Sequence, residues 1–297
     1  MEPIRALQST RKTCVMAIVN LTPDSFSDGG VNLPAEGKED NSKPKQLYQR
    51  ILTFADKGAR IIDIGGQSTA PGTEQVTDAE EISRILPFVL QLNDQRRFRK
   101  KIAISIDTYR SSVAKALDEV GNEGGIDIIN DVSAGQMDPN MLSTVARLGK
   151  TIVLMHMRGT PETMNSHTSY PDGLIPTIAK ELLERIAAAE AAGIYRWRII
   201  LDPGIGFAKN QDQNLEILRR FDELRDWPGL RGLPWLLGSS RKNFVGQITG
   251  VKTPAQRGWG SAATVAAAVQ GGADIVRVHD VVQMVQVVKM SDAIWRV

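Results

Sequence analysis

The chain has 297 residues, of which 42% are hydrophobic and 24% are charged, and this composition is ordinary for a globular protein. Its 36 Lys and Arg nearly balance its 34 Asp and Glu, so charge alone provides no attraction to nucleic acid or to acidic membranes. No apolar run is long enough to cross a bilayer, residues 1–12 lack the apolar segment of a secretory signal, and a single cysteine, Cys14, excludes an intrachain disulfide.

Short apolar runs alternate with helical patterns along the whole chain. In chain order, the runs predict strands at 14–19, 60–64, 102–106, 127–129, 151–155, 199–201, 235–237 and 274–276. Helical periodicity is clearest at 78–94, 173–192 and 255–270, and Gly149, Gly193 and the pair Gly271-Gly272 stand where helices should end. The polar stretch 32–45 predicts a long loop after the first strand.

These elements amount to about eight strand–helix units, the pattern of a (β/α)8 TIM barrel. We therefore predict an α/β fold with a single domain over residues 1–297, in which about residues 13–291 form the barrel itself. A doubly wound open sheet is the competing fold. The barrel is favoured because no composition break divides the chain and no Gly-x-Gly-x-x-Gly motif follows the first strand.

Nearly every predicted strand is followed at once by a polar or charged side chain. The set comprises Asn20, residues 65–69, Asp107, Asn130, Asp131, His156, Asp202, residues 239–242, Arg277 and His279. Taken singly, each has an ordinary structural explanation, such as capping a turn or lying in solvent. In a barrel, however, the C-terminal ends of the strands converge on the face that carries the active site. The set as a whole therefore predicts a polar site there.

One half of this set suits a flat heterocycle. Asp107 and Asp202 supply carboxylate acceptors, and the Asn130 amide both donates and accepts. Such groups can pair with the N–H donors and the carbonyl of a heterocyclic ring and fix its orientation.

The other half suits a phosphate or diphosphate. Arg277 and His279 are cation-capable donors, and the Asn20 carbonyl could ligate a hard cation such as Mg²⁺. No residue has the setting of an activated nucleophile: Cys14 begins the first strand, at the end opposite to the site, and Ser240 has no evident base.

Several segments resemble the signatures of the dihydropteroate synthase family. Residues 16–30, Met-Ala-Ile-Val-Asn-Leu-Thr-Pro-Asp-Ser-Phe-Ser-Asp-Gly-Gly, resemble the first signature closely, and residues 61–72 resemble the second. Further matches follow in family order at 105–109, 129–131, 154–157, 201–207, 238–242 and 277–280. The first signature is highly specific, and the matches together cover the chain from about residue 14 to about residue 290.

This resemblance implies that p-aminobenzoate condenses with 6-hydroxymethyl-7,8-dihydropterin diphosphate to give 7,8-dihydropteroate and pyrophosphate. It assigns pterin binding to Asp107, Asn130, Met155, Asp202 and Lys242. It assigns diphosphate binding to Asn20, Thr69, Arg277 and His279, with Mg²⁺ at Asn20. It assigns p-aminobenzoate binding to Phe26, Asp28, Thr69, Pro71, Phe207 and Ser240. The catalytic residues would be Asn20, Asp107, Lys242, Arg277 and His279.

The resemblance also implies a mechanism and a set of partners. Pyrophosphate would leave first, and the arylamine would then attack the cationic carbon, so no enzyme nucleophile is needed. Mobile loops would follow the first two strands, and Phe26 and Asp28 would close over the site from the first of them. Sulfonamides would compete with p-aminobenzoate, and a homodimer would form through the late helices. We expect a cytoplasmic protein, although the family includes longer chains fused to other folate-pathway domains, some of them organellar.

Two residues of the second loop depart from the family pattern. Ala70 stands where many members have Arg, and Gln67 replaces a common Glu. The changes remove one charge of each sign, so either activity is retained or the handling of p-aminobenzoate and sulfonamides is altered. Two alternative functions stay open: a pterin-dependent methyltransferase on the same barrel, which has no diphosphate to bind, and a non-catalytic pterin-binding subunit.

Overall fold

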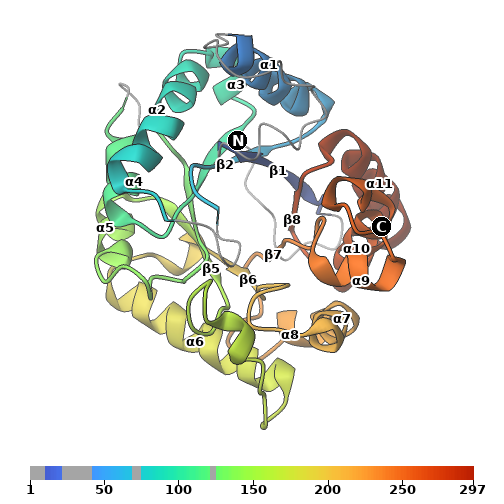
Figure 1. Cartoon of the computed structure of the whole chain (residues 1–297). Helices are drawn as coiled ribbons and strands as arrows, with labels where there is room; N and C mark the ends of the chain where they lie inside the picture. The colour runs from blue at the N-terminus through green and yellow to red at the C-terminus, as the bar shows by residue number, and fades with distance from the viewer. Residues whose placement is uncertain (1–10, 22–41, 69–74, 121–124) are drawn as a thin grey trace.

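A computed structural model describes residues 11–21, 42–68, 75–120 and 125–297, and its eight parallel strands form a barrel (Figure 1). The strands are hydrogen-bonded in the order β6-β5-β4-β3-β2-β1-β8-β7, and a bridge between Leu201 and Trp235 brings the two edges together. The predicted (β/α)8 barrel is therefore confirmed, and the open sheet is excluded. The strands are β1 Cys14–Asn20, β2 Ile61–Gly65, β3 Ala103–Asp107, β4 Ile128–Asp131, β5 Thr151–Met155, β6 Ile199–Asp202, β7 Leu236–Leu237 and β8 Ile275–Val278.

Helices surround the strands (Figure 1). They are α1 Ser42–Lys57, α2 Asp78–Asn93, α3 Arg96–Arg99, α4 Ser111–Asp118, α5 Met141–Leu148, α6 Leu174–Ala191, α7 Gln211–Arg219, α8 Phe221–Arg225, α9 Asn243–Thr249, α10 Gly258–Gly271 and α11 Val281–Trp295, with 3-10 turns η2 Met164–Ser166, η3 Arg196–Arg198 and η4 Pro254–Gln256. None of the helices in the described part of the chain is both long and apolar enough to cross a membrane.

Most strands extend one or two residues further than their apolar runs. The ladder continues through polar residues, and it pairs Asn20 with Gly65 and Asp107 with Asn130. The site residues that were predicted just after the strands, Asn20, Asp107, Asn130, Asp202 and Arg277, are therefore strand residues themselves. A strand holds its side chains more rigidly than a loop does, so these groups are fixed in direction by the sheet.

Two predicted boundaries are wrong. The loop predicted at 32–45 ends earlier, because α1 begins at Ser42 and accommodates Pro44 in its first turn, where no backbone N–H is needed. The helix predicted at 255–270 is divided into η4 and α10. The glycine stops are confirmed: Gly149 and Gly272 end their helices in the left-handed conformation, with φ of 65° and 101°. The loops expected to be mobile after β1 and β2 fall largely outside the described residues.

The barrel interior is built in layers. One apolar residue from each strand joins a single cluster that fills the lower interior: Met16, Ile61, Ala103, Ile128, Val153, Ile200, Leu236 and Ile275. Alternate residues of a strand face the same side, so the residue two positions later also faces inward, one layer higher. That second layer comprises Ile18, Asp63, Ser105, Asn130, Met155, Asp202, Gly238 and Arg277. It is largely polar, and it forms the floor of the candidate site.

Candidate functional site

Asp63 belongs to the polar layer and is fully buried. Its Oδ2 accepts hydrogen bonds from Arg277 Nε at 2.6 Å and from Asn130 Nδ2 at 3.1 Å. A buried carboxylate needs such partners, because burial without them costs several kcal/mol. Sequence reasoning missed Asp63. The signal available in the sequence was a single acid inside an apolar run, and the structure shows that every residue of this strand is buried.

Asp107 faces the same guanidinium. Its Oδ2 lies 2.5 Å from Arg277 Nη2, so Arg277 bridges Asp63 and Asp107. Burial raises the pKa of Asp107 to about 7, although Arg277 opposes the shift. Burial would lower the pKa of Arg277, but the two carboxylates hold it above its ordinary value. Arg277, which was predicted to bind diphosphate, is therefore also tied to the acids of the heterocycle half.

Asp202 and Lys242 complete the buried polar set. The Asp202 Oδ1 accepts the backbone N–H of Gly204 at 2.7 Å, yet burial raises the pKa of Asp202 to about 6. Burial, with Arg277 nearby, lowers the pKa of Lys242 to about 8. Lys242 Nζ lies 4.1 Å from the centroid of the Phe207 ring, a cation–π contact. Lys242 thus reaches both the acids and the aromatic wall.

An apolar wall stands beside these polar groups. Met155 and Phe207 are buried in one cluster, together with Tyr109, Val132, Met157, Met164 and Ala208. Met155 also pairs with Asp202 in the sheet register. A flat ring could therefore lie against apolar side chains while its edge meets carboxylates, as is typical of small-molecule sites.

His279 lies where cations converge. Its Nδ1 is 3.1 Å from Ser240 Oγ, and Ser240 Oγ also accepts the His279 backbone N–H at 3.2 Å. Burial lowers the pKa of His279 to about 3, and Arg241, Arg277, Lys242 and Arg50 add to the shift. His279 is therefore a neutral hydrogen-bonding group in a positive field. Such a field favours an anionic ligand.

Arg241 holds the loop between β7 and α9 in a strained form. Its φ is +60°, in the left-handed region that disfavours a side chain, and its backbone N–H donates to Ser261 Oγ at 2.9 Å. The guanidinium makes a bidentate pair with Asp280, at 2.5 and 3.1 Å. These contacts fix the backbone on either side, where Ser240 and Lys242 lie. Arg241 belongs to the predicted strand-end set, whereas Arg50 on α1 was not predicted.

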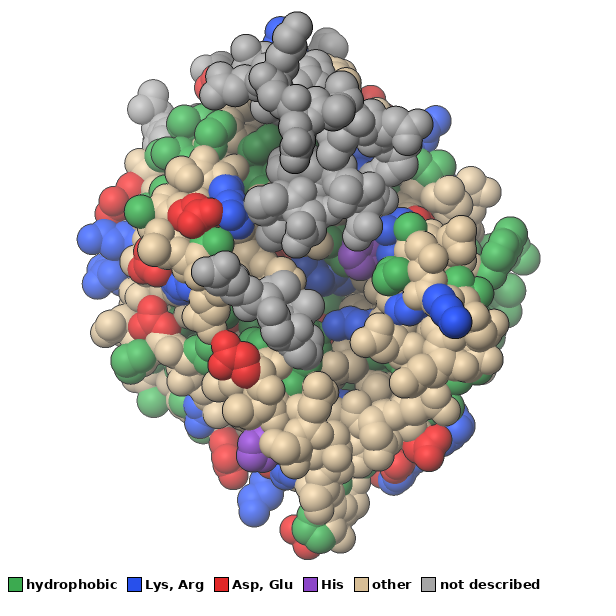
Figure 2. All heavy atoms as spheres, viewed as in Figure 1, with side chains coloured by type: hydrophobic (Ala, Val, Ile, Leu, Met, Phe, Trp, Pro, Cys, Tyr) green, Lys and Arg blue, Asp and Glu red, His purple; other side chains and the backbone are tan. Residues whose placement is uncertain are grey.

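Figure 2 shows the corresponding surface, on which Lys, Arg and His side chains gather at a hollow near the centre of the face. Asn20 is exposed at the end of β1. A side chain at Gly65 would stand 3.7 Å from its Oδ1, so the glycine leaves space beside this oxygen. In the described part of the chain, no three His, Cys, Asp or Glu side chains are grouped to hold a metal ion. Any metal at Asn20 would need oxygens from the substrate or water, which Mg²⁺ commonly uses.

Two polar residues at strand ends point away from this site. His156 is buried and lies 2.7 Å from Glu181 of α6 through its Nε2. Asp131 accepts hydrogen bonds from the Ser133 and Gly135 backbones at 2.8 and 2.7 Å, so it orders its own loop. For these two residues the ordinary structural explanation holds.

Some predicted residues cannot be placed. Phe26, Asp28, Thr69, Ala70 and Pro71 lie outside the described residues. The neighbouring departure is placed: Gln67 Oε1 accepts from Arg110 Nη1 at 2.6 Å, and Gln67 Nε2 lies 3.1 Å from the Tyr109 hydroxyl. Cys14 lies at the opposite end of β1, where burial raises the pKa of its thiol to about 11, so it is no nucleophile.

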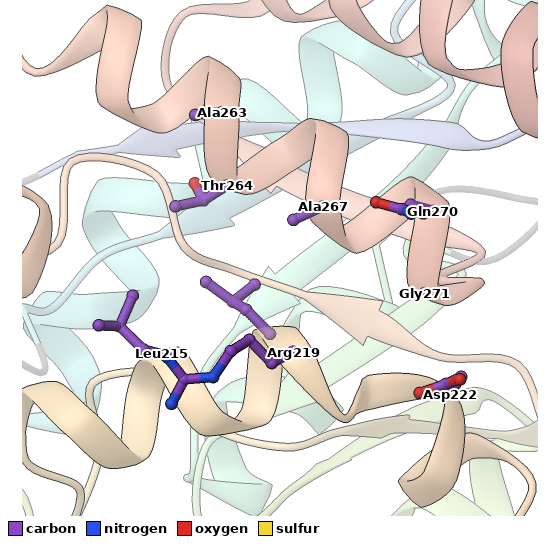
Figure 3. Close-up of a pocket in the computed structure, with 9 residues that line it drawn as sticks. Leu215, Arg219, Asp222, Ala263, Thr264, Ala267, Gln270 and Gly271 are labelled. Atoms are coloured by element: carbon purple, nitrogen blue, oxygen red, sulfur yellow. The ribbon is translucent and has the colours of Figure 1, made fainter.

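A second hollow lies outside the barrel. This groove has a volume of about 630 Å³ and runs between α7, α8 and α10 (Figure 3). Leu215 and Arg219 line one wall, and Ala267 and Gln270 line the other. None of its lining residues belongs to the strand-end set, so we assign the chemistry to the barrel mouth.

Comparison with known proteins agrees with this geometry. The model of the pterin binding enzyme family matches residues 16–279. The chain is 48% identical to the folic acid synthesis protein fol1 of Pneumocystis carinii over 96% of its own length, but it spans only 36% of that protein. It is 44% identical to the dihydropteroate synthase of Synechocystis, covering 96% of this chain and 91% of that protein.

A solved structure points the same way. The dihydropteroate synthase of Clostridium difficile, determined in the presence of pteroic acid, superposes with a TM-score of 0.82 and 36% sequence identity, covering 97% of this chain and 98% of that one. The family match spans most of the chain, and both sequence and fold agree with full-length relatives. The chain therefore belongs to the dihydropteroate synthase family of pterin-binding enzymes.

Proposed function

We propose that this chain condenses p-aminobenzoate with 6-hydroxymethyl-7,8-dihydropterin diphosphate to form 7,8-dihydropteroate and pyrophosphate. The observation that carries the proposal is the bridge from Arg277 to Asp63 and Asp107. This bridge joins a buried acidic pocket to the cation-rich surroundings of His279. A substrate with a heterocycle at one end and a diphosphate at the other would span both halves.

The pterin would bind in the acidic half. Asp107, Asn130 and Asp202 present oxygens and an amide to the ring edge, Lys242 reaches the same pocket, and Met155 would pack against the ring. Buried groups of this kind discriminate strongly, because a ligand that lacks the matching donor leaves them unpaired.

The diphosphate would bind in the cationic half. Arg277 and His279 would hold its oxygens, with Thr69 from the second loop, and Lys242 and Arg241 would contribute to the positive field. Asn20 would ligate Mg²⁺ through its Oδ1, with substrate oxygens and water as the other ligands. Bound Mg²⁺ would neutralise charge on the diphosphate.

The p-aminobenzoate would lie between Phe207 and Ser240, with Thr69, Pro71, Phe26 and Asp28 completing its pocket. Sulfonamides resemble this substrate in shape and charge, so we propose that they compete for the same place.

The reaction would proceed by departure followed by attack. The bond between the exocyclic carbon and the diphosphate oxygen breaks, and its electron pair leaves with pyrophosphate. Arg277 and the field around His279 stabilise the leaving charge, and Asp107 and Asp202 stabilise the positive charge on the pterin. The arylamine nitrogen then forms the new bond and loses a proton to solvent. No step requires a protein nucleophile.

The decisive experiment is turnover of the purified chain. We expect pyrophosphate release that requires both p-aminobenzoate and Mg²⁺. A chain that binds the pterin diphosphate but releases no pyrophosphate would be a binding subunit, and transfer of a methyl group would identify a methyltransferase. Either result would contradict the proposal.

We also propose a homodimer formed through the late helices. Large apolar side chains are exposed on three helices that lie together in Figure 1: Ile248 of α9, Trp259 of α10, and Met290 and Ile294 of α11. Trp259 is 91% exposed. Apolar surface that spans several elements is typical of a protein interface.

A further inference from the structure

A buried polar group lies behind the candidate site, and the proposed mechanism does not use it. It is centred on Lys209, which lies in the segment between β6 and α7. The Lys209 side chain is buried, with only 8% of the residue exposed. Lys209 Nζ lies 2.9 Å from the Phe207 carbonyl oxygen, 2.9 Å from His156 Nδ1 and 3.5 Å from the His156 carbonyl oxygen. An ammonium group has three N–H donors, so all of them have acceptors here.

His156 connects this lysine to a carboxylate. Because Lys209 donates to Nδ1, the hydrogen of the neutral imidazole lies on Nε2 and is donated to Glu181 Oε2 at 2.7 Å. Burial, with Lys209 and Arg158 nearby, lowers the pKa of His156 to about 4. Despite burial, hydrogen bonds from His156 and Arg158 lower the pKa of Glu181 to about 2. The positive charge of Lys209 and the negative charge of Glu181 therefore lie on opposite sides of a neutral histidine.

Two further contacts hold the segment that carries Lys209 in place. Gly204 has φ +71°, and a Cβ there would stand 2.0 Å from the His156 carbonyl oxygen, so only glycine lets the segment pack this closely. The Tyr170 hydroxyl donates to the Ala208 carbonyl at 2.9 Å. Phe207 of this segment and Asp202, the last residue of β6, face the site.

We propose that Lys209 is a positioning residue: it holds the Phe207 backbone in place and supplies a positive charge behind Asp202. This inference rests on the proposed function, in which Phe207 contacts p-aminobenzoate and Asp202 contacts the pterin. A buried hydrogen bond to a charged donor is among the stronger contacts that a loop can make.

The charges around these two groups give Lys209 its second role. Lys242, Arg277 and Lys209 are the cations that oppose the raised pKa of Asp202. Burial lowers the pKa of Lys209 to about 7; Asp202 and Glu181 oppose this shift, and Arg158 and Lys242 add to it. Lys209 is therefore charged in the acid range in which Asp202 titrates. Loss of the Lys209 charge leaves Asp202 with two cations, so its pKa rises further and it becomes protonated at a higher pH.

The test compares Lys209→Met with Lys209→Gln in the pyrophosphate-release assay. We expect Lys209→Met to raise KM for p-aminobenzoate about tenfold, the effect of losing one buried charge-assisted hydrogen bond. We expect the acid limb of the pH profile to move to higher pH in both variants. Lys209→Gln keeps a donor for the Phe207 carbonyl, so it should recover part of KM but not the pH limb. Lys180→Met, at an exposed position on α6, is the control and should match the native protein.

Thermal unfolding shows whether each variant is folded. If Lys209→Met fails to fold, Tyr170→Phe removes a milder contact of the same segment and should raise KM for p-aminobenzoate in the same direction. If Lys209→Met folds, a native KM for p-aminobenzoate together with a native acid limb overturns the inference. If Lys209→Met does not fold, a native KM in Tyr170→Phe overturns it. An inactive native chain instead defeats the proposed function, which the same assay measures first.

Discussion

At the scale of single residues, Asp63 couples the two halves of the site. One carboxylate oxygen, Oδ2, accepts a hydrogen bond from Arg277 and another from Asn130. The guanidinium and the amide are therefore both positioned by Asp63. The guanidinium then extends to Asp107. A change at Asp63 should therefore be felt at both ends of a bound substrate.

We predict that Asp63→Asn lowers kcat on the order of a hundredfold, the range for losing one preorganised electrostatic partner. Asparagine keeps the size of the side chain but removes the charge that orients Arg277. The measurement is steady-state pyrophosphate release. Asp127→Asn is the matched control, because Asp127 also pairs with an arginine, Arg99 at 2.6 Å, but at the opposite end of the barrel. Equal losses in both variants would reduce Asp63 to a stability role.

The raised pKa values of Asp107 and Asp202 predict how pterin binding depends on pH. Burial favours the protonated forms, with pKa values of about 7 and about 6, whereas the N–H donors of a pterin need carboxylates. Affinity should therefore fall as the pH falls from about 7.5 to about 5.5, by at most about tenfold per pH unit for each group. Calorimetric titration with the pterin diphosphate would measure this. Asp107→Asn should flatten the upper part of the curve, and an affinity that is constant over this window would contradict the prediction.

At the scale of elements, the loop between β7 and α9 depends on one ion pair. Arg241 holds a left-handed backbone between Ser240 and Lys242, and Asp280 at the start of α11 holds its guanidinium. The ion pair between Arg241 and Asp280 therefore positions Ser240 and Lys242 although neither member of the pair was assigned to the substrate pocket.

We predict that Asp280→Asn raises KM for the pterin diphosphate about threefold to tenfold, equivalent to roughly 1 kcal/mol for a weakened charge-assisted pair. Kinetics at fixed p-aminobenzoate would measure it. Asp226→Asn is the control, since Asp226 makes the same bidentate contact with Arg225 on an exposed surface. If KM is native in Asp280→Asn, the loop is held by its backbone alone.

The strands also show what the sequence could and could not predict. Continuous apolar runs located all eight strands and hence the barrel, because parallel strands are buried on both faces. The same continuity hides which residues face inward. Asn130 and Met155 point into the site, but Asp131 and His156, one residue later, point away. Asp63 faces inward yet looks like an interruption of an apolar run.

At the scale of the whole molecule, the two ends of the barrel have different tasks. The lower end is filled by the apolar cluster and fastened by contacts between the chain ends, where Thr13 donates to Asp292 of α11 at 2.9 and 2.7 Å. The upper end carries Asp63, Asp107 and Asp202 around Arg277, and burial of such charges costs stability. Most of the fold could therefore be predicted from local patterns, while the site needed the three-dimensional register.

The exposed apolar surface of α9, α10 and α11 leads to a prediction about assembly. If a second copy covers this surface, Trp259→Ser should shift the mass measured by light scattering from twice 32.5 kDa toward 32.5 kDa on dilution. A buried interface tryptophan contributes on the order of 2 kcal/mol, which weakens a dimer more than tenfold. Trp197→Ser is the matched control, because Trp197 of η3 is 69% exposed and lies outside these helices. If the native chain is monomeric at every concentration, the dimer is refuted. If Trp259→Ser and Trp197→Ser shift the mass equally, the choice of surface is refuted. Because the Trp259 side chain is 91% exposed, turnover per chain should survive the substitution.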